Sequence, residues 1–245
     1  MVEIYILVAL IVGSVGSVAL AAALLLLSDR KMYQVSELLV SLAGGTLLGA
    51  AFLGMMPKAT SMLEAPLVFK LMLLGIILFF ILEKIILWRT CQNKDCERQH
   101  DASAQLILIG DAFHNFIDGV VIVAAFHTSI SFGIAVAVSV FAHEVPQEIA
   151  DFGILIKNGF TRKKALLYNM LSGVTALLGG FLAHYTIDAM SNIVPYVLAF
   201  SASSFIYIAL ADLVPQMHQS TKISKSLGQI SLIILGIGII YFIKK

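Results

Sequence analysis

Two short segments place imidazole, carboxylate and amide side chains inside long apolar runs. The first, "HNFIDG", covers residues 114–119, and the second, "HEVPQEIADF", covers residues 143–152. In a helix, side chains three or four residues apart lie on one face, so His114 stacks with Asp118. In the second segment, His143 shares a helix face in the same way with the glutamine four residues later. The sequence therefore predicts two polar stripes that must be buried against each other.

These stripes carry the ligands of an intermediate divalent cation. One imidazole from each helix, with carboxylate and amide oxygens between them, suits zinc, ferrous iron or manganese. The further candidate residues are Asp111 and Asn115 in the first segment, and Glu144, Gln147, Glu148 and Asp151 in the second.

A structural reading is that these polar groups pair with one another and only hold two helices together. An aspartate at the centre of a membrane helix costs roughly 2.5 to 3.5 kcal/mol on insertion scales. An interhelical hydrogen bond in a membrane contributes only about 0.6 kcal/mol on average, so pairing alone would offset only a small part of the insertion cost. We therefore favour a functional role for the two segments together. For Asp111 or Asp151 taken singly, the two readings remain equal.

The composition predicts that these segments lie in a membrane. The chain has 245 residues, of which 59% are hydrophobic and 13% charged, and its mean hydropathy is +0.95. Soluble domains carry about 25% charged residues. A membrane helix needs roughly 20 apolar residues, and eight such runs occur. They cover residues 4–27, 36–57, 66–88, 103–126, 131–156, 164–188, 193–215 and 227–243.

The predicted fold is all-α: a polytopic membrane protein with eight transmembrane helices in one bundle, and residues 1–245 as a single transmembrane domain. The apolar runs are continuous rather than alternating, which excludes a transmembrane β-barrel. Nucleic acid is not an expected partner, because the basic residues lie in loops rather than in a patch. The expected partners are metal ions and the lipid bilayer, and a homodimer stays open beside a monomer.

The loop charges predict an orientation. The first, third, fifth and seventh loops hold most of the basic loop residues, whereas the second, fourth and sixth offer only Lys58. Positive loops favour the cytoplasmic side, so both termini should be extracytoplasmic. Lys244 and Lys245 argue mildly against this. The expected location is the plasma membrane, as a multi-pass protein of a bacterial inner membrane.

Together the two segments resemble the paired signatures of the ZIP family of zinc- and iron-regulated transporter-like proteins, prokaryotic type. "SLAGGTLLGAAFLGMMP" at 41–57 and "SSFIYIALADLVP" at 203–215 fit the family too, so the likeness covers essentially the whole chain. The resemblance implies uptake of divalent transition metals into the cytoplasm by an elevator-like movement. Zinc is the first expectation, with iron, manganese or cadmium as alternatives. No prosthetic group is expected, and no nucleotide motif is present, so a gradient must drive transport.

The resemblance also implies a binuclear metal site midway across the membrane. One metal would be surrounded by His114, Asp118, His143 and Gln147, and the other by Asn115, Asp118, Glu144 and Gln147. Asp118 would then bridge the two metals. The other acids of the two segments would touch these ligands or line the ion path.

The chain departs from the family pattern in two places. Many members have a histidine three residues before the proline that ends the second span, where this chain has Gly54, followed by Met55 and Met56. That removes a relay ligand unless a methionine thioether replaces it. At position 147 one branch of the family carries a second histidine. The neutral oxygen of Gln147 should weaken zinc preference and leave room for iron, manganese or cadmium.

Other function classes are weaker. A membrane metalloprotease with an H-E-x-x-H motif would need a histidine where Gln147 stands, so we expect no enzyme. A metal-sensing receptor without flux is not excluded by any residue.

Several polar residues outside the two segments have open roles. Glu83 is expected to extend toward the cytoplasm from the end of the third span. Asp212 and His218 lie at the cytoplasmic end of the seventh span, where an ion would be released or a helix end solvated. Two other sets stay open. Asn169, Ser172 and Thr175 face the metal path or pack helices, and Cys91, Cys96 and His100 form a polar loop or, less favoured, catch a soft metal.

Overall fold

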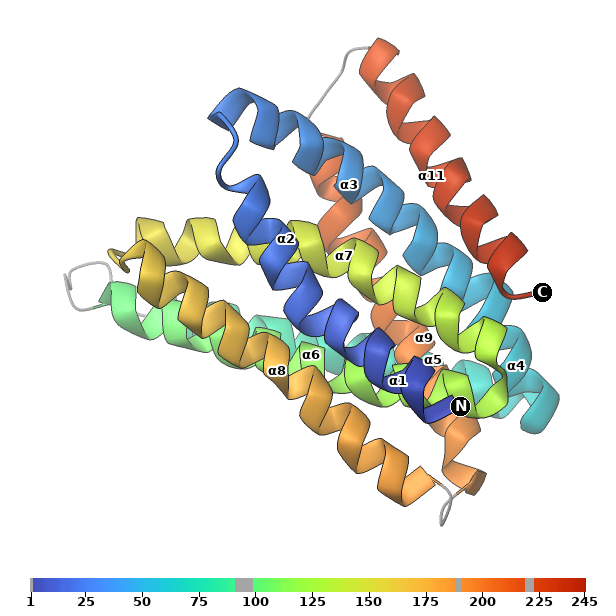
Figure 1. Cartoon of the computed structure of the whole chain (residues 1–245). Coiled ribbons are helices and arrows are strands. Elements are labelled where there is room, and N and C mark those ends of the chain that lie inside the picture. Colours follow the sequence, from blue (N-terminus) through green and yellow to red (C-terminus); the bar gives the residue numbers. More distant parts are fainter. Residues whose placement is uncertain (1, 91–98, 188–190, 219–222) are drawn as a thin grey trace.

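A computed structural model describes residues 2–90, 99–187, 191–218 and 223–245 of the chain (Figure 1). These residues form helices and short turns, with no strand among them. Eight helices or helix series are long and apolar enough to cross a membrane, which confirms the predicted eight-span fold.

The first two spans and the seventh are each built from several segments. The first contains α1 (Val2–Ile11), the π-helix η1 (Val12–Gly16) and α2 (Ser17–Leu24), and the second contains α3 (Asp29–Gly49), η2 (Ala50–Met55) and α4 (Met56–Met62). The seventh contains η3 (Ser191–Ile193), α9 (Val194–Tyr207), η4 (Ile208–Leu213) and α10 (Val214–Met217). The other spans are α5 (Ala65–Thr90), α6 (Gln99–Thr128), α7 (Ile130–Lys157), α8 (Arg162–Ile187) and α11 (Ile223–Ile243).

Some helices extend beyond the predicted spans. The second span, predicted at 36–57, runs over Arg30–Met62. The added residues include Arg30, Lys31 and Lys58, and next to the added N-terminal turn Glu37 pairs with Lys225 at the start of α11, with 2.9 Å between Oε2 and Nζ. Hydropathy marks only the part of a helix that crosses the apolar layer, so a helix that continues into water is underestimated at its polar end.

Prolines follow two of the π-helical segments at the same distance. Pro57 and Pro215 each stand two residues after the end of η2 and η4. Each proline lacks the N–H that would bond the carbonyl four residues earlier, and a π-bulge is one way to absorb that loss. In η2 the freed carbonyl of Leu53 accepts a hydrogen bond from Lys244 Nζ. Pro146, by contrast, lies inside α7, which stays helical throughout.

Close backbone approach joins α6 to α8. A Cβ added at Gly119 would lie 1.9 Å from the carbonyl oxygen of Ala176, and one at Gly179 would lie 2.1 Å from that of Phe116. Thr175 Oγ1 also donates to the carbonyl of Ala112, at 2.5 Å. This close packing fixes α6 against α8.

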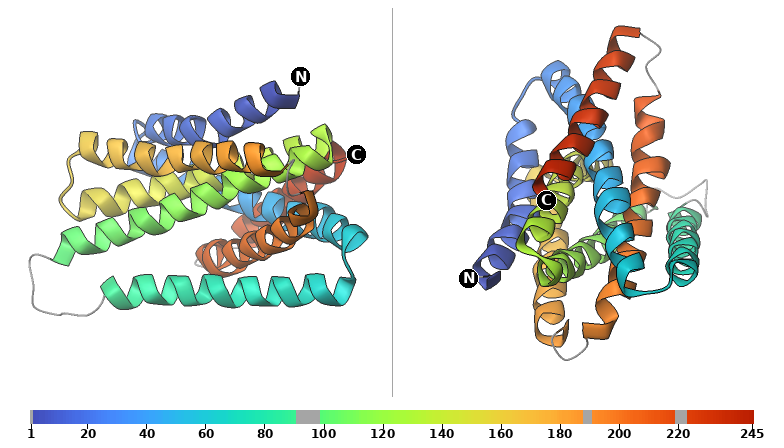
Figure 2. Two further views of the ribbon diagram at one scale, coloured as in Figure 1. Left: turned by 90° about the horizontal axis from the view of Figure 1, so that it is seen from below. Right: turned by 90° about the vertical axis from the view of Figure 1, so that its right-hand side faces the viewer.

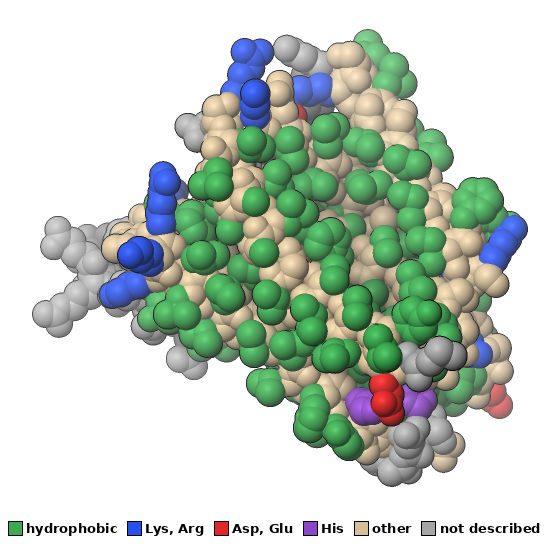
Figure 3. Space-filling model, in the orientation of Figure 1, with side chains coloured by type: hydrophobic (Ala, Val, Ile, Leu, Met, Phe, Trp, Pro, Cys, Tyr) green, Lys and Arg blue, Asp and Glu red, His purple; other side chains and the backbone are tan. Residues whose placement is uncertain are grey.

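The α6 and α7 helices lie inside the bundle, whereas α5 and α11 lie at its edges (Figures 1 and 2). The face drawn in Figure 3 is mostly hydrophobic, with lysine and arginine side chains at its margins, as a lipid-facing surface requires. The two ends of the described chain lie on one side of the bundle (Figure 1). Their orientation to the membrane stays a prediction.

Candidate metal centre

The two predicted polar stripes meet between α6 and α7. Nε2 of His114 and Nε2 of His143 lie 3.0 Å apart. Asp118 Oδ2 lies 3.0 Å from His143 Nε2 and 3.6 Å from His114 Nε2. Glu144 Oε1 lies 3.5 and 3.7 Å from the same two nitrogens. These four side chains form what we call the histidine site; their ligand atoms all lie within 4.8 Å of one another.

Backbone contacts orient the deeper imidazole. The Nδ1 atom of His143 donates to the carbonyl of Ser139 at 2.8 Å, one turn earlier in α7. A proton held on Nδ1 leaves the lone pair of Nε2 free for a metal, which is the usual arrangement at metal-binding histidines. The ring of Phe205 meets this imidazole edge to face, with 5.6 Å between the ring centres. The Nε2 atom is thus held facing Asp118 and Glu144.

Asp111 is held by two amide side chains. Asn115 Nδ2 donates to its Oδ1 at 3.1 Å, and Gln147 Nε2 donates to the same oxygen at 2.8 Å. In the structure the nitrogens of both amides bond this carboxylate, and the metal-ligand role that the resemblance implies for them stays a prediction. The second oxygen of Asp111 has no hydrogen-bond partner.

A second group of acids adjoins the histidine site. Asp111, Glu144 and Glu148 can bring one oxygen each to within 4.8 Å of the others. We call these three side chains the carboxylate group, and Glu144 belongs to both sets. Asp151, the remaining predicted residue, is 7% exposed and lines the adjacent pocket without joining either set.

The acids of both sets are buried with few hydrogen-bond partners and with no basic ion-pair partner among the lysines and arginines that the structure describes. Asp111, Asp118, Glu144 and Glu148 are at most 5% exposed, and both carboxylate oxygens of Asp118, Glu144 and Glu148 lack a hydrogen-bond partner. In the described part of the chain, no lysine or arginine forms an ion pair with them. Several buried carboxylates require a cation or neutralisation, because an isolated buried charge is very costly.

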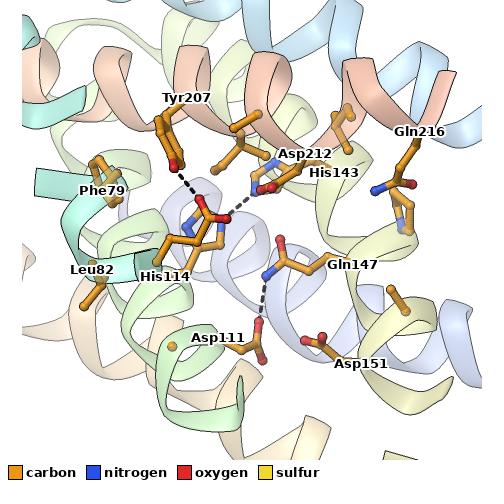
Figure 4. A pocket seen from close by; sticks show the side chains of 17 residues that line it. Phe79, Leu82, Asp111, His114, His143, Gln147, Asp151, Tyr207, Asp212 and Gln216 are labelled. Carbon is orange, nitrogen blue, oxygen red and sulfur yellow. Dashed lines mark hydrogen bonds between the residues drawn. The ribbon is translucent and has the colours of Figure 1, made fainter. Parts of the chain in front are cut away.

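A pocket of about 440 Å³ leads to both sets (Figure 4). It reaches His114 and His143 and continues toward the helix ends that precede the third, fifth and seventh loops. Figure 4 shows Asp111, Gln147 and Asp151 on one side of it and Tyr207 and Asp212 on another. Its walls therefore come from α5, α6, α7 and the seventh span.

Sequence reasoning missed part of this wall. Glu83, which was expected to extend toward the cytoplasm, lines the pocket and accepts a hydrogen bond from the hydroxyl of Tyr207. Phe79 and Tyr207 were not singled out, and Asp212 had two open roles. The available signal was an acid inside each of two apolar spans, Glu83 in the third and Asp212 in the seventh.

The polar residues of α8 contact neighbouring helices. Asn169 Nδ2 donates to the backbone carbonyl of Glu148 at 3.1 Å, and Thr175 bonds α6 as described above. Ser172 bonds carbonyls of its own helix. Helix packing therefore accounts for Thr175, whereas Asn169 abuts the carboxylate group. The predictions for Cys91 and Cys96 fall outside the described residues, as does the side chain of His100.

Gly54, which stands where many family members have a histidine, packs against an aromatic ring. A Cβ at this position would lie 2.5 Å from Cε2 of Phe132, so the phenyl ring occupies the space that a larger side chain would need. Met55 is fully buried in the apolar core. A relay ligand at position 54 is therefore replaced by an aromatic contact between η2 and α7.

Comparison with known proteins identifies the family. A family model described as ZIP zinc transporter matches residues 1–103 and 89–244. The zinc transporter foi of Drosophila melanogaster is 42% identical over 135 residues, which are 55% of this chain and 19% of that protein. Human zinc transporter ZIP6 is 43% identical over 118 residues, or 46% of this chain and 15% of that protein. Mouse zinc transporter ZIP10 is 40% identical over 114 residues, or 46% and 14%.

This chain therefore spans less than a fifth of the length of these curated relatives. The family model, in contrast, matches nearly all of the chain, including both polar segments and all eight spans. The chain belongs to the ZIP zinc transporter family.

Proposed function

We propose that this chain takes up divalent transition-metal ions, zinc first, across the plasma membrane into the cytoplasm without ATP. The observation that carries the proposal is the histidine site. Two imidazole nitrogens 3.0 Å apart, with two buried carboxylates beside them, lie between membrane-spanning helices. The named relatives are zinc transporters, which agrees with this donor set. Iron, manganese and cadmium remain alternative cargoes.

The direction of transport follows from the proposed orientation. If the positive loops face the cytoplasm, both termini are extracytoplasmic and the pocket opens toward the cytoplasm. Asp151, Asp212 and Glu83 line this pocket between the histidine site and that side. An ion leaving the site would therefore pass acidic side chains.

The opposite side of the histidine site is closed by apolar packing. The side chains there are at most 7% exposed, so they leave no path for a hydrated ion. They are Val121, Ile122 and Ala125 of α6, Phe132, Val136 and Val140 of α7, and Leu198, Ala202 and Phe205 of α9. We infer that this conformation faces the cytoplasm and that uptake requires a second one, in which this packing opens.

Metal-resolved uptake in proteoliposomes tests the proposal. We expect the native chain to carry zinc down a gradient, and His143→Ala and Asp118→Ala to reduce the initial rate at least about tenfold, because each removes a ligand of the dehydrated ion. His184→Ala, which removes a histidine of α8 outside the site, is the matched control and should keep the native rate. Unchanged flux in both site variants would remove the proposed function.

An enzyme and a receptor are the competing classes. A hydrolase of the H-E-x-x-H type needs a second imidazole at position 147, where the Gln147 amide instead bonds Asp111. We therefore propose a transporter and not an enzyme, with residues 1–245 acting as one transporter domain. A receptor would bind zinc in the same site without net flux, so the uptake assay separates it from a transporter. Binding of a second copy to form a homodimer is not needed for the site.

A further inference from the structure

A second pocket, of about 360 Å³, lies at the other end of the bundle from the pocket in Figure 4. Along α6 and α7 the pocket in Figure 4 contacts residues 110–114 and 143–151, whereas the second pocket contacts residues 128–132. Its other walls come from η2, α4 and the end of α11. We call it the lysine pocket; the residues that line it are Leu53, Gly54, Pro57, Lys58, Ser61, Thr128, Ser129, Phe132 and Lys244.

The charge of the lysine pocket is positive. Lys58 and Lys244 are half-buried in its wall, which contains no acidic side chain. Among the residues that the structure describes, neither lysine forms an ion pair with an acid. The pocket in Figure 4 has the opposite composition, with four acids and neither lysine nor arginine in its wall. Two ammonium groups repel a divalent cation, so the lysine pocket suits an anion and not the transported metal.

Backbone contacts position two hydrogen-bond donors of this pocket. Lys244 Nζ donates to the carbonyl of Leu53, which holds the ammonium group at the pocket and leaves two of its N–H bonds for a ligand. Ser129 Oγ accepts from the amide of Phe132 at 3.1 Å, so its own proton can be donated. Its other contact is a long one, 3.4 Å from the hydroxyl of Ser131. Ammonium and hydroxyl donors together match the several acceptor oxygens of a phosphate group.

The place of the pocket along the spans favours a lipid phosphate over a dissolved one. The α4, α6 and α11 helices all end at this pocket, so it lies where three spans leave the apolar layer. Phospholipid headgroups lie at this depth, and lysines near helix ends extend to them. Phe52 and Phe242 are 51% and 72% exposed and stand one residue before Leu53 and two before Lys244. Exposed apolar side chains beside ammonium groups suit a ligand with acyl chains and an anionic headgroup.

We propose that the lysine pocket binds the phosphate group of an anionic phospholipid, with Lys58, Lys244 and Ser129 as its donors. A phosphate bound there joins the turn between α6 and α7 to α4 and to the end of α11. The contact between Gly54 and Phe132 lies in the same wall, so the lipid stabilises the conformation in which this side of the bundle is closed. A zwitterionic phospholipid carries an ammonium group of its own and gains less from the two lysines.

Photo-crosslinking of the full chain in liposomes tests this inference. A phosphatidylglycerol with a photoreactive headgroup is mixed into phosphatidylcholine, and mass spectrometry of the peptides locates the label. We expect label on the segments that form the lysine pocket. The double variant Lys58→Gln with Lys244→Gln should lower the yield there at least about tenfold, because a lysine near a membrane surface strengthens the binding of an anionic lipid by roughly fivefold. Lys70→Gln, which removes an exposed lysine of α5 outside the pocket, is the matched control and should label as the native chain does.

Label at the opposite end of the bundle separates a specific effect from misfolding. Yields near Lys157 and Arg162 should be equal in all variants, which shows that each is folded and inserted. An unchanged yield at the lysine pocket in the double variant would overturn the inference. Equal competition by unlabelled phosphatidylcholine and phosphatidylglycerol would also overturn it. If inorganic phosphate suppresses the label and unlabelled phosphatidylglycerol does not, the pocket binds a dissolved anion and the lipid assignment is wrong. Metal uptake is not part of this measurement, so its outcome is independent of the proposed function.

Discussion

Replacing Gly119 by alanine tests whether close contact between α6 and α8 holds the histidine site together. This glycine follows Asp118 directly and faces the backbone of α8. An added Cβ would lie 1.9 Å from the carbonyl oxygen of Ala176 and 2.8 Å from the amide nitrogen of Gly180. Both neighbours are backbone atoms, so neither can move away by a side-chain rotation.

The size of the effect follows from these distances. An ordinary contact between such atoms is about 3.4 Å or more, so the two helices must separate locally by about 1.5 Å. Overpacking of this kind costs typically 1 to 3 kcal/mol of stability. The shift acts on Asp118, whose Oδ2 lies only 3.0 Å from His143. A misplacement of about 1 Å at a reacting site can cost on the order of a hundredfold in rate.

Zinc uptake and thermal unfolding of the same preparations measure the two effects. We expect Gly119→Ala to lower both the uptake rate, by at least about tenfold, and the melting temperature. Gly153→Ala is the matched control, because a Cβ at this position in α7 would meet no atom within 4 Å. It should keep the native uptake rate and, as alanine favours helices, be as stable or up to about 1 kcal/mol more stable. Native uptake and stability in Gly119→Ala would refute the packing argument.

Three further outcomes follow from the same structure. Gln147→His replaces the amide that bonds Asp111 with an imidazole, so zinc should outcompete manganese more strongly than in the native chain, as measured by competitive uptake. Zinc uptake should fall at least about threefold between pH 7.5 and 5, because imidazole binds metal only when deprotonated; a flat profile would contradict the histidine site. Lys225→Ala breaks an exposed ion pair with Glu37, and because such pairs add little to stability, unfolding in denaturant and zinc uptake should both stay close to native.

The helical spacing in two segments was enough to predict that their polar faces meet, whereas the binding of a metal there stays a prediction. Residues four apart on α6 and α7 share a face, and polar faces inside a membrane must meet each other. The eight spans could be predicted for a related reason, because an apolar layer about 30 Å thick imposes a minimum length on each helix. Both predictions depend on local periodicity, which a single sequence records directly.

Contacts between distant segments could not be predicted in this way. The hydrogen bond between Glu83 and Tyr207 joins residues 124 positions apart, and no local pattern links them. The contacts of Asn115 and Gln147 could not be predicted for a similar reason, because an amide can offer oxygen to a metal or nitrogen to a carboxylate. Only the position of Asp111 between them decides this, and that depends on how α6 and α7 are rotated against each other.

The ligand types change in order along the pocket, and this order bears on release. The closed end holds the two imidazoles, the next part of the wall has Asp111 with the Gln147 amide, and the open end has the separated acids Asp151 and Asp212. Zinc prefers nitrogen donors, so each step toward the open end replaces strong ligands by weaker oxygens and water. If the open end faces the cytoplasm, a zinc ion is held most tightly where it is dehydrated and progressively less tightly as it leaves. Under the proposed function, charge alone would hold the ion among these acids, and the loss of nitrogen ligands would let it leave.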